Sequence, residues 1–442
     1  MATMSIVISV TLFIISFMLF RRGLTNPVIL FFAIWCAVCV FSVYENTFVH
    51  GSVTAYLLIN IMLICFFCGS LFYFFPPSKK KVWVDSLESN PEEQLEHISF
   101  GVVYVLLIIY IVLSAVDSFI LIKNLFSGTQ LWVMRGWRMA TYGVDSNPIV
   151  DRQSFIEVVF RAVVLYPFQN IVAPMAAYLF FEKKLRIKYH WFFLLTIICL
   201  LLTVISTGGS RNTIVYYFGC FLLAFLFSSK RDVPEQKKTK RQSGRFFGII
   251  AIVAIGFAFI VAVTSARTSI SLGTSISSYL GIPPTLLGIH LQTIQSIPHT
   301  RGILTAFGLL TYPIRFLQQV GLTTLVPKSY DNAYQAMLEA QRYIVVNSAG
   351  LNRNAYVTPI YYFMIDGGIP FLVVASTIFG VATGRFSRNF FESITITSFV
   401  YYAIIMQAIL FSFVQVPTVQ PSFVFSLILA GLILNKQKIR IQ

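Results

Sequence analysis

The 442-residue chain is 57% hydrophobic and only 11% charged, with a mean hydropathy of +0.76 and a formal net charge of +16. A soluble protein of this length cannot bury so much apolar surface, so the composition predicts an all-α polytopic membrane protein. The positive charge forms no basic groove with interleaved aromatic residues outside the apolar runs, and nucleic acid is therefore not an expected partner.

Eleven apolar runs have about the length of a bilayer-spanning helix. They cover residues 4–20, 27–44, 53–75, 98–122, 155–181, 190–206, 212–228, 246–264, 358–382, 393–413 and 419–435. The first run has no basic segment before it and no small-residue cleavage site after it, which predicts a retained span. We expect one integral membrane domain over residues 1–442.

Lysine and arginine clusters fall in every second connection between these runs. The clusters are Arg21-Arg22, Lys79-Lys80-Lys81, Lys183 to Lys188, Lys230 to Arg245, Arg385 with Arg388, and Lys436 to Arg440. The positive-inside rule puts these connections in the cytoplasm, with the N-terminus outside and the C-terminus cytoplasmic. The longest cytoplasmic connection is polar and basic, and it fits a flexible loop beside anionic membrane lipids.

Four of the six cysteines form two C-x-x-C pairs, Cys36 with Cys39 and Cys65 with Cys68. In a soluble domain this spacing would favour zinc. Each pair lies inside an apolar run, where a cysteine is commonly a plain buried residue. We expect neither a metal site nor a structural disulfide.

Two outer segments are long enough to carry chemistry. The first, residues 123–154, is basic; the second, residues 265–357, is the longest stretch outside the membrane. Within the second, Ile303 to Phe316 is apolar enough to dip into the bilayer or lie on it. Asp331 to Val346 has apolar residues at helical spacing and predicts a short amphipathic helix.

The connection Ser206-Thr-Gly208-Gly209-Ser-Arg211 lies between two of the spans. Its two glycines allow the backbone to approach a ligand closely, and Arg211 begins the next helix, where unpaired N–H groups favour an anion. We interpret it as half of a phosphate site on the outer face. The alternative is an ordinary turn whose arginine extends to lipid headgroups.

The basic residues outside the cytoplasmic clusters are ten arginines and two lysines. They are Lys123, Arg135, Arg138, Arg152, Arg161, Arg211, Arg267, Arg301, Arg315, Lys328, Arg342 and Arg353. Orientation in the membrane can use either residue type, whereas a bidentate guanidinium is needed to hold a phosphate or carboxylate. This excess of arginine indicates an anionic substrate on the outer side.

Arg161 and Asp366 are charged residues inside predicted spans, and such residues face a partner or a substrate. For Arg161 the expected partner is Glu157, one turn earlier on the same face, and a helix brace explains this pair as well as a ligand role does. Asp366 is a candidate base or an acid that orients an arginine.

Other outer residues offer acid–base chemistry or a sugar-binding face. His290 and His299 could act as a base, although a loop histidine is more often merely solvated. Tyr279, in Tyr279-Leu-Gly-Ile-Pro-Pro284, supplies an aromatic face for a sugar beside rigid turns. The chain has no phosphate-loop motif, no dinucleotide-binding motif and no D-x-D pair, so a cytosolic nucleotide is not an expected substrate.

The chain resembles the bacterial oligosaccharide repeat-unit polymerases, the Wzy-type enzymes of O-antigen and capsule assembly. The resemblance covers most of the length, and the most specific stretch is Asn354-Ala-Tyr-Val-Thr358 followed by Tyr362-Phe-Met-Ile-Asp366-Gly-Gly. The chain has Asp366-Gly-Gly where the family pattern often reads Asp-Phe-Gly.

The resemblance implies a GT-C-like glycosyltransferase fold and a transfer that needs neither metal nor cofactor. It implies an undecaprenyl-pyrophosphate glycan as donor, a lipid-linked repeat unit as acceptor, a chain-length regulator as partner, and the bacterial plasma membrane as location. We expect a clamp that holds pyrophosphate and glycan, with arginines from both outer segments, from the fifth predicted span and from the hairpin: Arg135, Arg138, Arg161, Arg211, Arg267 and Arg353. Asp366 is the first candidate for the base or for an acid that orients an arginine, and His290 is the second candidate for the base.

Two other functions remain open. A ligase of related fold would move the finished glycan from the same lipid to another acceptor. A flippase or other transporter is the alternative from a different class, although internal repeats are typical of transporters and none is detected in this chain.

Overall fold

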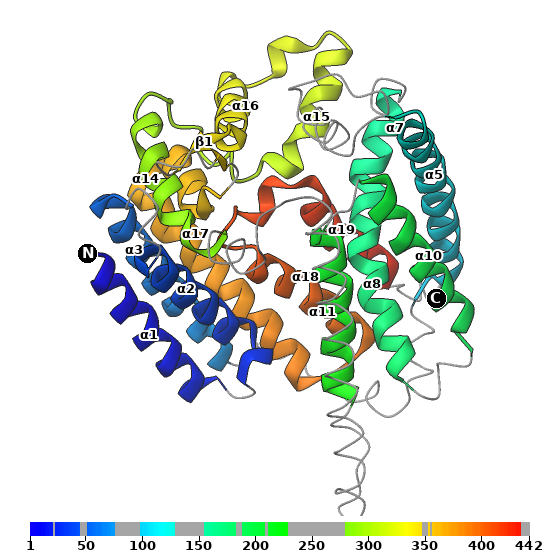
Figure 1. The fold of residues 1–442 in the computed structure, drawn as a ribbon, viewed down its shortest axis with the longest axis horizontal. Helices are drawn as coiled ribbons and strands as arrows, with labels where there is room; N and C mark the ends of the chain where they lie inside the picture. The colour runs from blue at the N-terminus through cyan, green and yellow to red at the C-terminus, as the bar shows by residue number, and fades with distance from the viewer. Residues whose placement is uncertain are drawn as a thin grey trace, which may run out of the picture. The chain divides into compact units, whose positions relative to one another are not determined.

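A computed structural model of the chain describes residues 1–20, 23–44, 51–75, 98–128, 154–182, 188–207, 211–228, 279–346, 352–353 and 356–434. These residues are mostly helical, as the composition predicts (Figure 1). Within them, five helices are long and apolar enough to cross a membrane, and five shorter apolar helices accompany them. The protein is therefore a membrane protein by the length and composition of its helices.

Ten of the eleven predicted spans coincide with these ten helices, and the other predicted span, residues 246–264, lies outside the described residues. The helices are α1 (Ala2–Leu19), α2 (Pro27–Tyr44), α3 (Val53–Ser70), α5 (Phe100–Phe126), α7 to α8 (Phe155–Phe181), α10 (His190–Ser206), α11 (Arg211–Ser228), α17 (Thr358–Glu392), α18 (Ile396–Leu410) and α19 (Pro421–Leu434). A total of eleven spans stays a prediction.

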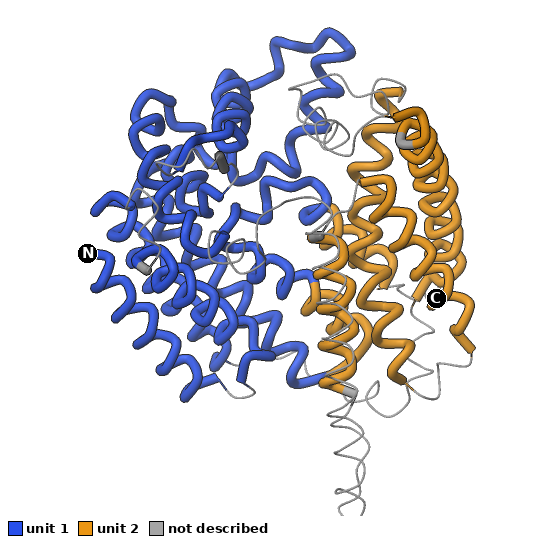
Figure 2. The backbone as a smooth tube through the Cα atoms, in the orientation of Figure 1, with its two compact units in different colours: residues 1–82, 273–393, 404–424 blue, residues 83–272, 394–403, 425–442 orange. Residues whose placement is uncertain are grey.

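The chain divides into two compact units, which Figure 2 shows in different colours. Unit 1 comprises residues 1–82, 273–393 and 404–424, and unit 2 comprises residues 83–272, 394–403 and 425–442. Unit 1 contains α1, α2, α3 and α17 together with the described part of the long outer segment. Unit 2 contains α5, α7, α8, α10 and α11.

In unit 1, α3 and α17 pack together through small residues. A Cβ atom at Gly380 would lie 2.1 Å from the carbonyl oxygen of Phe66, and one at Gly69 would lie 2.1 Å from that of Thr377. Glycine is therefore required for the two backbones to approach so closely, as in small-residue packing between membrane helices. This contact fixes the second part of α17 against α3.

The helix α17 is interrupted inside the predicted span. The backbone leaves the helical region at Gly367 (φ −175°, ψ 27°) and Gly368 (φ 65°, ψ −153°), and Pro370 follows in the first turn of the second segment. The dihedral angles of Gly368 fall in a region that is essentially restricted to glycine. The predicted span over residues 358–382 therefore coincides with α17, and the Gly-Gly-x-Pro sequence kinks this helix after Asp366.

The described part of the long outer segment contains three short α-helices and a pair of antiparallel strands. These are α14 (Pro283–Ile294), α15 (Phe307–Gln319), α16 (Lys328–Gln341), β1 (Ile344–Val345) and β2 (Asn352–Arg353). The predicted amphipathic helix is α16, which ends earlier than expected because β1 pairs with β2 in antiparallel register, Ile344 opposite Arg353. The apolar stretch predicted to approach the bilayer becomes a turn followed by α15, with Phe307, Gly308, Thr311 and Ile314 buried.

Candidate functional site

Asp366 ends the first segment of α17 and is only 1% exposed. Its Oδ1 accepts hydrogen bonds from the Thr300 hydroxyl, from the Gly302 amide at 2.9 Å and from the Leu304 amide at 3.0 Å. Its Oδ2 accepts one from the Thr305 amide at 2.7 Å. We call residues 299–305 the strap, because this stretch of chain is bound across the break in α17.

Backbone hydrogen bonds also join the strap to the broken helix. The Thr300 amide donates to the carbonyl oxygen of Ile365 at 3.1 Å, and the Arg301 amide donates to that of Asp366 at 2.9 Å. The last carbonyls of a helix have no partner within the helix, and here the strap supplies two donors. Since Asp366 follows Thr358 by eight residues, the strap contacts α17 roughly 12 Å from the first residue of the helix. Non-helical backbone inside a membrane would require hydrogen-bond partners from the protein, and the strap supplies such partners.

Arg301 has a left-handed backbone, with φ 54°, and its side chain is exposed. A non-glycine residue held in this region costs about 1–3 kcal/mol and persists only where its surroundings determine the conformation. Thr300 and Gly302 on either side are both bound to Asp366, and the Arg301 amide is bound as well. The strap therefore presents a guanidinium to solvent at the break.

His299 lies at the same break, with an exposed side chain. Its Nδ1 is 3.1 Å from the carbonyl oxygen of Ile365. Because a carbonyl oxygen can only accept, we assign the hydrogen to Nδ1, which leaves Nε2 of the neutral ring as an acceptor. A backbone carbonyl that fixes the tautomer in this way is typical of a histidine that takes a proton or a ligand at Nε2.

His290 has a different environment from the one expected. It lies on α14 instead of in an open loop, is 1% exposed, and packs against Tyr361 with ring centroids 5.3 Å apart. Burial, with a smaller effect from the charge of Arg342, lowers the pKa of His290 to about 4. The geometry favours His299 over His290 as the proton acceptor, because His299 combines exposure with an oriented ring.

Tyr279 stacks on Tyr356, with ring centroids 5.5 Å apart and planes at 27°. Tyr356 stacks in turn on Phe413 at 6.3 Å, also at 27°. All three rings are half-buried; Tyr279 precedes α14, Tyr356 precedes α17 and Phe413 follows α18. The predicted aromatic face is thus part of a three-ring stack, and its role in sugar binding stays a prediction.

Arg161 lies in unit 2 and is 5% exposed. Its guanidinium contacts Glu157 at 2.7 Å, which confirms the predicted partner, and Asp117 of α5 at 2.5 Å, which the sequence did not indicate. The backbone forms a π-helical turn from Arg161 to Leu165. With two carboxylates bound to it, Arg161 serves as a brace between α5 and the fifth predicted span.

The remaining clamp residues are described only in part. Arg135, Arg138, Arg267, Gly208 and Gly209 lie outside the described residues, as do most of the basic outer segment and the turn of the glycine hairpin. For two others the structure gives the backbone: Arg211 begins α11 and Arg353 lies in β2. The clamp as a set stays a prediction.

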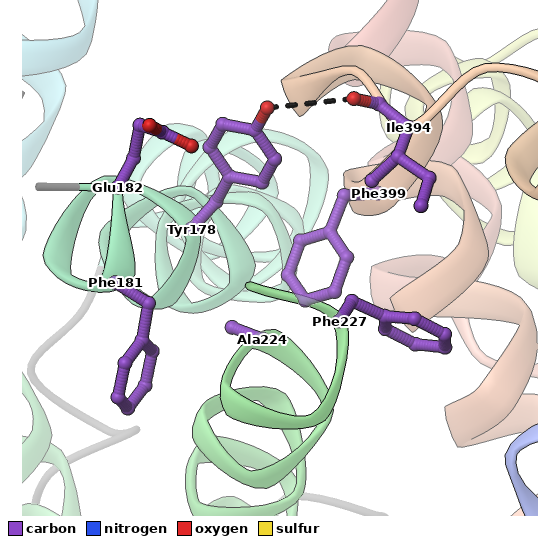
Figure 3. Close-up of a pocket in the computed structure, with 7 residues that line it drawn as sticks. All are labelled: Tyr178, Phe181, Glu182, Ala224, Phe227, Ile394 and Phe399. Atoms are coloured by element: carbon purple, nitrogen blue, oxygen red, sulfur yellow. Dashed lines mark hydrogen bonds between the residues drawn. The ribbon is translucent and has the colours of Figure 1, made fainter. Parts of the chain in front are cut away.

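Among the described residues, no three histidine, cysteine or acidic side chains lie close enough together to hold a metal ion. A pocket in unit 2 is lined by Tyr178, Phe181, Glu182, Ala224, Phe227, Ile394 and Phe399 (Figure 3). The Tyr178 hydroxyl donates to the Ile394 carbonyl oxygen at 3.5 Å. The lining is mainly aromatic and offers no proton acceptor beside an arginine, so the strap is the better candidate site.

Comparisons of the chain with models of protein families, with curated proteins and with solved structures give no match.

Proposed function

We propose that the protein is a glycosyltransferase that polymerises undecaprenyl-pyrophosphate-linked repeat units on the outer face of the bacterial plasma membrane. The observation that carries this proposal is the strap, which places an exposed arginine and an oriented histidine at a break in an apolar helix. A lipid-anchored anion has access to a site on a membrane-spanning helix, because both lie in the bilayer. The excess of arginine over lysine outside the cytoplasmic clusters supports the same substrate.

The proposed reaction assigns a separate role to each group. Nε2 of His299 accepts the proton of the acceptor hydroxyl, whose oxygen forms a bond to C1 of the donor sugar. The bond between C1 and the pyrophosphate oxygen breaks, and its electron pair stays with the pyrophosphate. Arg301, together with the predicted clamp, stabilises the charge that develops on this leaving group. No redox partner is required.

A transporter is the second candidate function, and the break in α17 favours it. Discontinuous helices with polar residues at the break are typical of substrate sites in transporters. A ligase would use the same donor and the same strap, so the site geometry supports it equally and only the acceptor differs.

Deletion of the gene followed by analysis of the lipid-linked glycans separates the two transferases. Loss of a polymerase leaves single lipid-linked repeats, whereas loss of a ligase leaves full-length chains on the lipid. We expect single repeats, and complementation by the intact gene should restore long chains. Accumulation of full-length lipid-linked chains would contradict the proposal.

Variants tested in the same complementation assay examine the arginines. We expect Arg301→Ala and Arg211→Ala to give short chains at matched protein levels, since each removes a charge assigned to the leaving group. Arg342→Ala is the matched control, because Arg342 lies in the same outer segment with 71% of its side chain exposed. Normal chains from both test variants would show that neither arginine is needed to hold the leaving group.

A further inference from the structure

We propose that Asp366 is a positioning residue, which holds the strap on the break of α17 and thereby sets the conformation of Arg301, and that it is not the base. Two kinds of measurement test this role. Measurements of activity rest on the proposed function, whereas hydrogen exchange of the strap amides does not depend on it.

The surroundings of Asp366 argue against its being the base. Oδ1 accepts three of the four hydrogen bonds from the strap and Oδ2 accepts the fourth, so both carboxylate oxygens are bound to the strap. A group that takes a proton from a substrate must have a lone pair directed at it. Asp366 is also 1% exposed, so a substrate hydroxyl has no direct access to it.

The same hydrogen bonds explain the conformation of Arg301. Asp366 binds the residues on both sides of Arg301, through the Thr300 hydroxyl and the Gly302 amide, and then binds the amides of Leu304 and Thr305. Three of the four donors are backbone amides, so the carboxylate fixes the path of the chain rather than one side chain. Removal of the anchor allows Arg301 to leave its left-handed conformation, which carries strain.

Hydrogen exchange of the strap amides tests the anchor directly on the purified full-length chain. In Asp366→Asn the side chain has one acceptor oxygen, and its NH2 group faces N–H donors, so at least one amide loses its partner. We expect the amides of Gly302, Leu304 and Thr305 to exchange about tenfold faster or more. Asp331→Asn, the same change at an exposed acid of α16, should leave them unchanged. Unchanged protection in Asp366→Asn would overturn the proposal.

Two threonines of the strap give a finer test. The Thr300 hydroxyl donates to Asp366, whereas the Thr305 hydroxyl is buried without a partner within the described residues. Thr300→Val should therefore speed exchange at Gly302, and Thr305→Val should not. Equal effects of the two variants would show that the hydroxyl contact does not hold the strap.

The pH dependence of activity separates positioning from proton transfer. If Asp366 positions the strap, the residual activity of Asp366→Asn should have a lower kcat but the same pH profile as the wild type. If it is the base, the limb of the profile that belongs to the base should disappear in this variant. A wild-type protein that shows no transfer would contradict the proposed function, and the exchange experiments would still decide the role of Asp366.

Discussion

Arg161 and Asp366 are both charged residues buried in predicted spans, and in both helices the regular backbone is interrupted at the charge. At Arg161 the interruption is a π-helical turn, and the partners are two carboxylates, Asp117 and Glu157. At Asp366 the helix breaks completely, and the partners are three amides and one hydroxyl of an outer strap. The first charge joins helices to each other, whereas the second joins a helix to an outer segment.

This difference decides which of the two sites leaves side chains available to a ligand. A buried ion pair needs both partners and fixes the distance between two helices. A carboxylate bound by backbone amides determines the path of a loop, and the side chains on that loop remain available to a ligand. Beside Asp366 lie the exposed side chains of His299 and Arg301.

The largest expected effect comes from removing the brace. Arg161→Met leaves Asp117 and Glu157 close together without their cation, and we expect a loss of about 3–5 kcal/mol in the free energy of unfolding. Arg342→Met is the control, because its contact with Glu339 is 3.7 Å long and exposed, and such pairs contribute about 0–1 kcal/mol. Unfolding of the purified protein in detergent measures both. Equal losses would show that Arg161 is not a brace.

A smaller loss of stability is expected from a substitution at the break in α17. Gly368→Ala forces a Cβ atom into dihedral angles that are essentially restricted to glycine, and we expect a loss of about 1–3 kcal/mol. Gly219→Ala in α11 is the matched substitution, because a Cβ atom there meets nothing within 4 Å. We expect it to be neutral or slightly stabilising in the same unfolding assay. A Gly368→Ala protein as stable as Gly219→Ala would show that the backbone at Gly368 is not constrained.

The smallest expected effect concerns His290, a buried side chain whose Nε2 has no hydrogen-bond partner within the described residues. Its pKa is lowered from 6.5 to about 4 in the folded state, so folding favours the neutral ring. The unfolded chain therefore binds more protons below about pH 6.5, and stability falls as the pH decreases from there towards about 4. At pH 5.5 the loss attributable to this histidine should be about 1–1.5 kcal/mol.

His290→Gln removes the titrating group and should flatten this part of the stability profile relative to the wild type. The comparison is made between the two proteins at each pH, since other groups titrate in both. Identical slopes between pH 6.5 and pH 5 would contradict the burial of a neutral His290.

The sequence predicts the helices of this protein better than their interruptions. Apolar runs are sufficient to find ten helices, five of which are long and apolar enough to cross a membrane. The break after Asp366 has a signal in Gly367, Gly368 and Pro370, but an apolar run that continues on both sides masks it. The start of α14 also has a signal, because Pro283 and Pro284 are suited to the first turn of a helix.

The partners at the two buried charges are harder to predict. Glu157 is found from Arg161 by helical spacing alone, whereas Asp117 is 44 residues away and requires knowledge of how α5 packs. The donors to Asp366 are 61 to 66 residues away, and most are backbone amides, which carry no mark in the sequence. His290 is buried on α14, whereas His299 is exposed on the strap. The spacing of residues in the sequence shows neither property.

The most direct test of the account uses purified full-length protein in detergent, where no compartments exist for transport. It is given a synthetic undecaprenyl-pyrophosphate-linked repeat unit, and the lipid-linked products are separated by size. We expect a ladder of longer glycans from the wild type and from Arg342→Ala, and its loss in His299→Ala and Arg301→Ala. A folded wild-type protein that lengthens no glycan, or equal ladders from all four proteins, would contradict it.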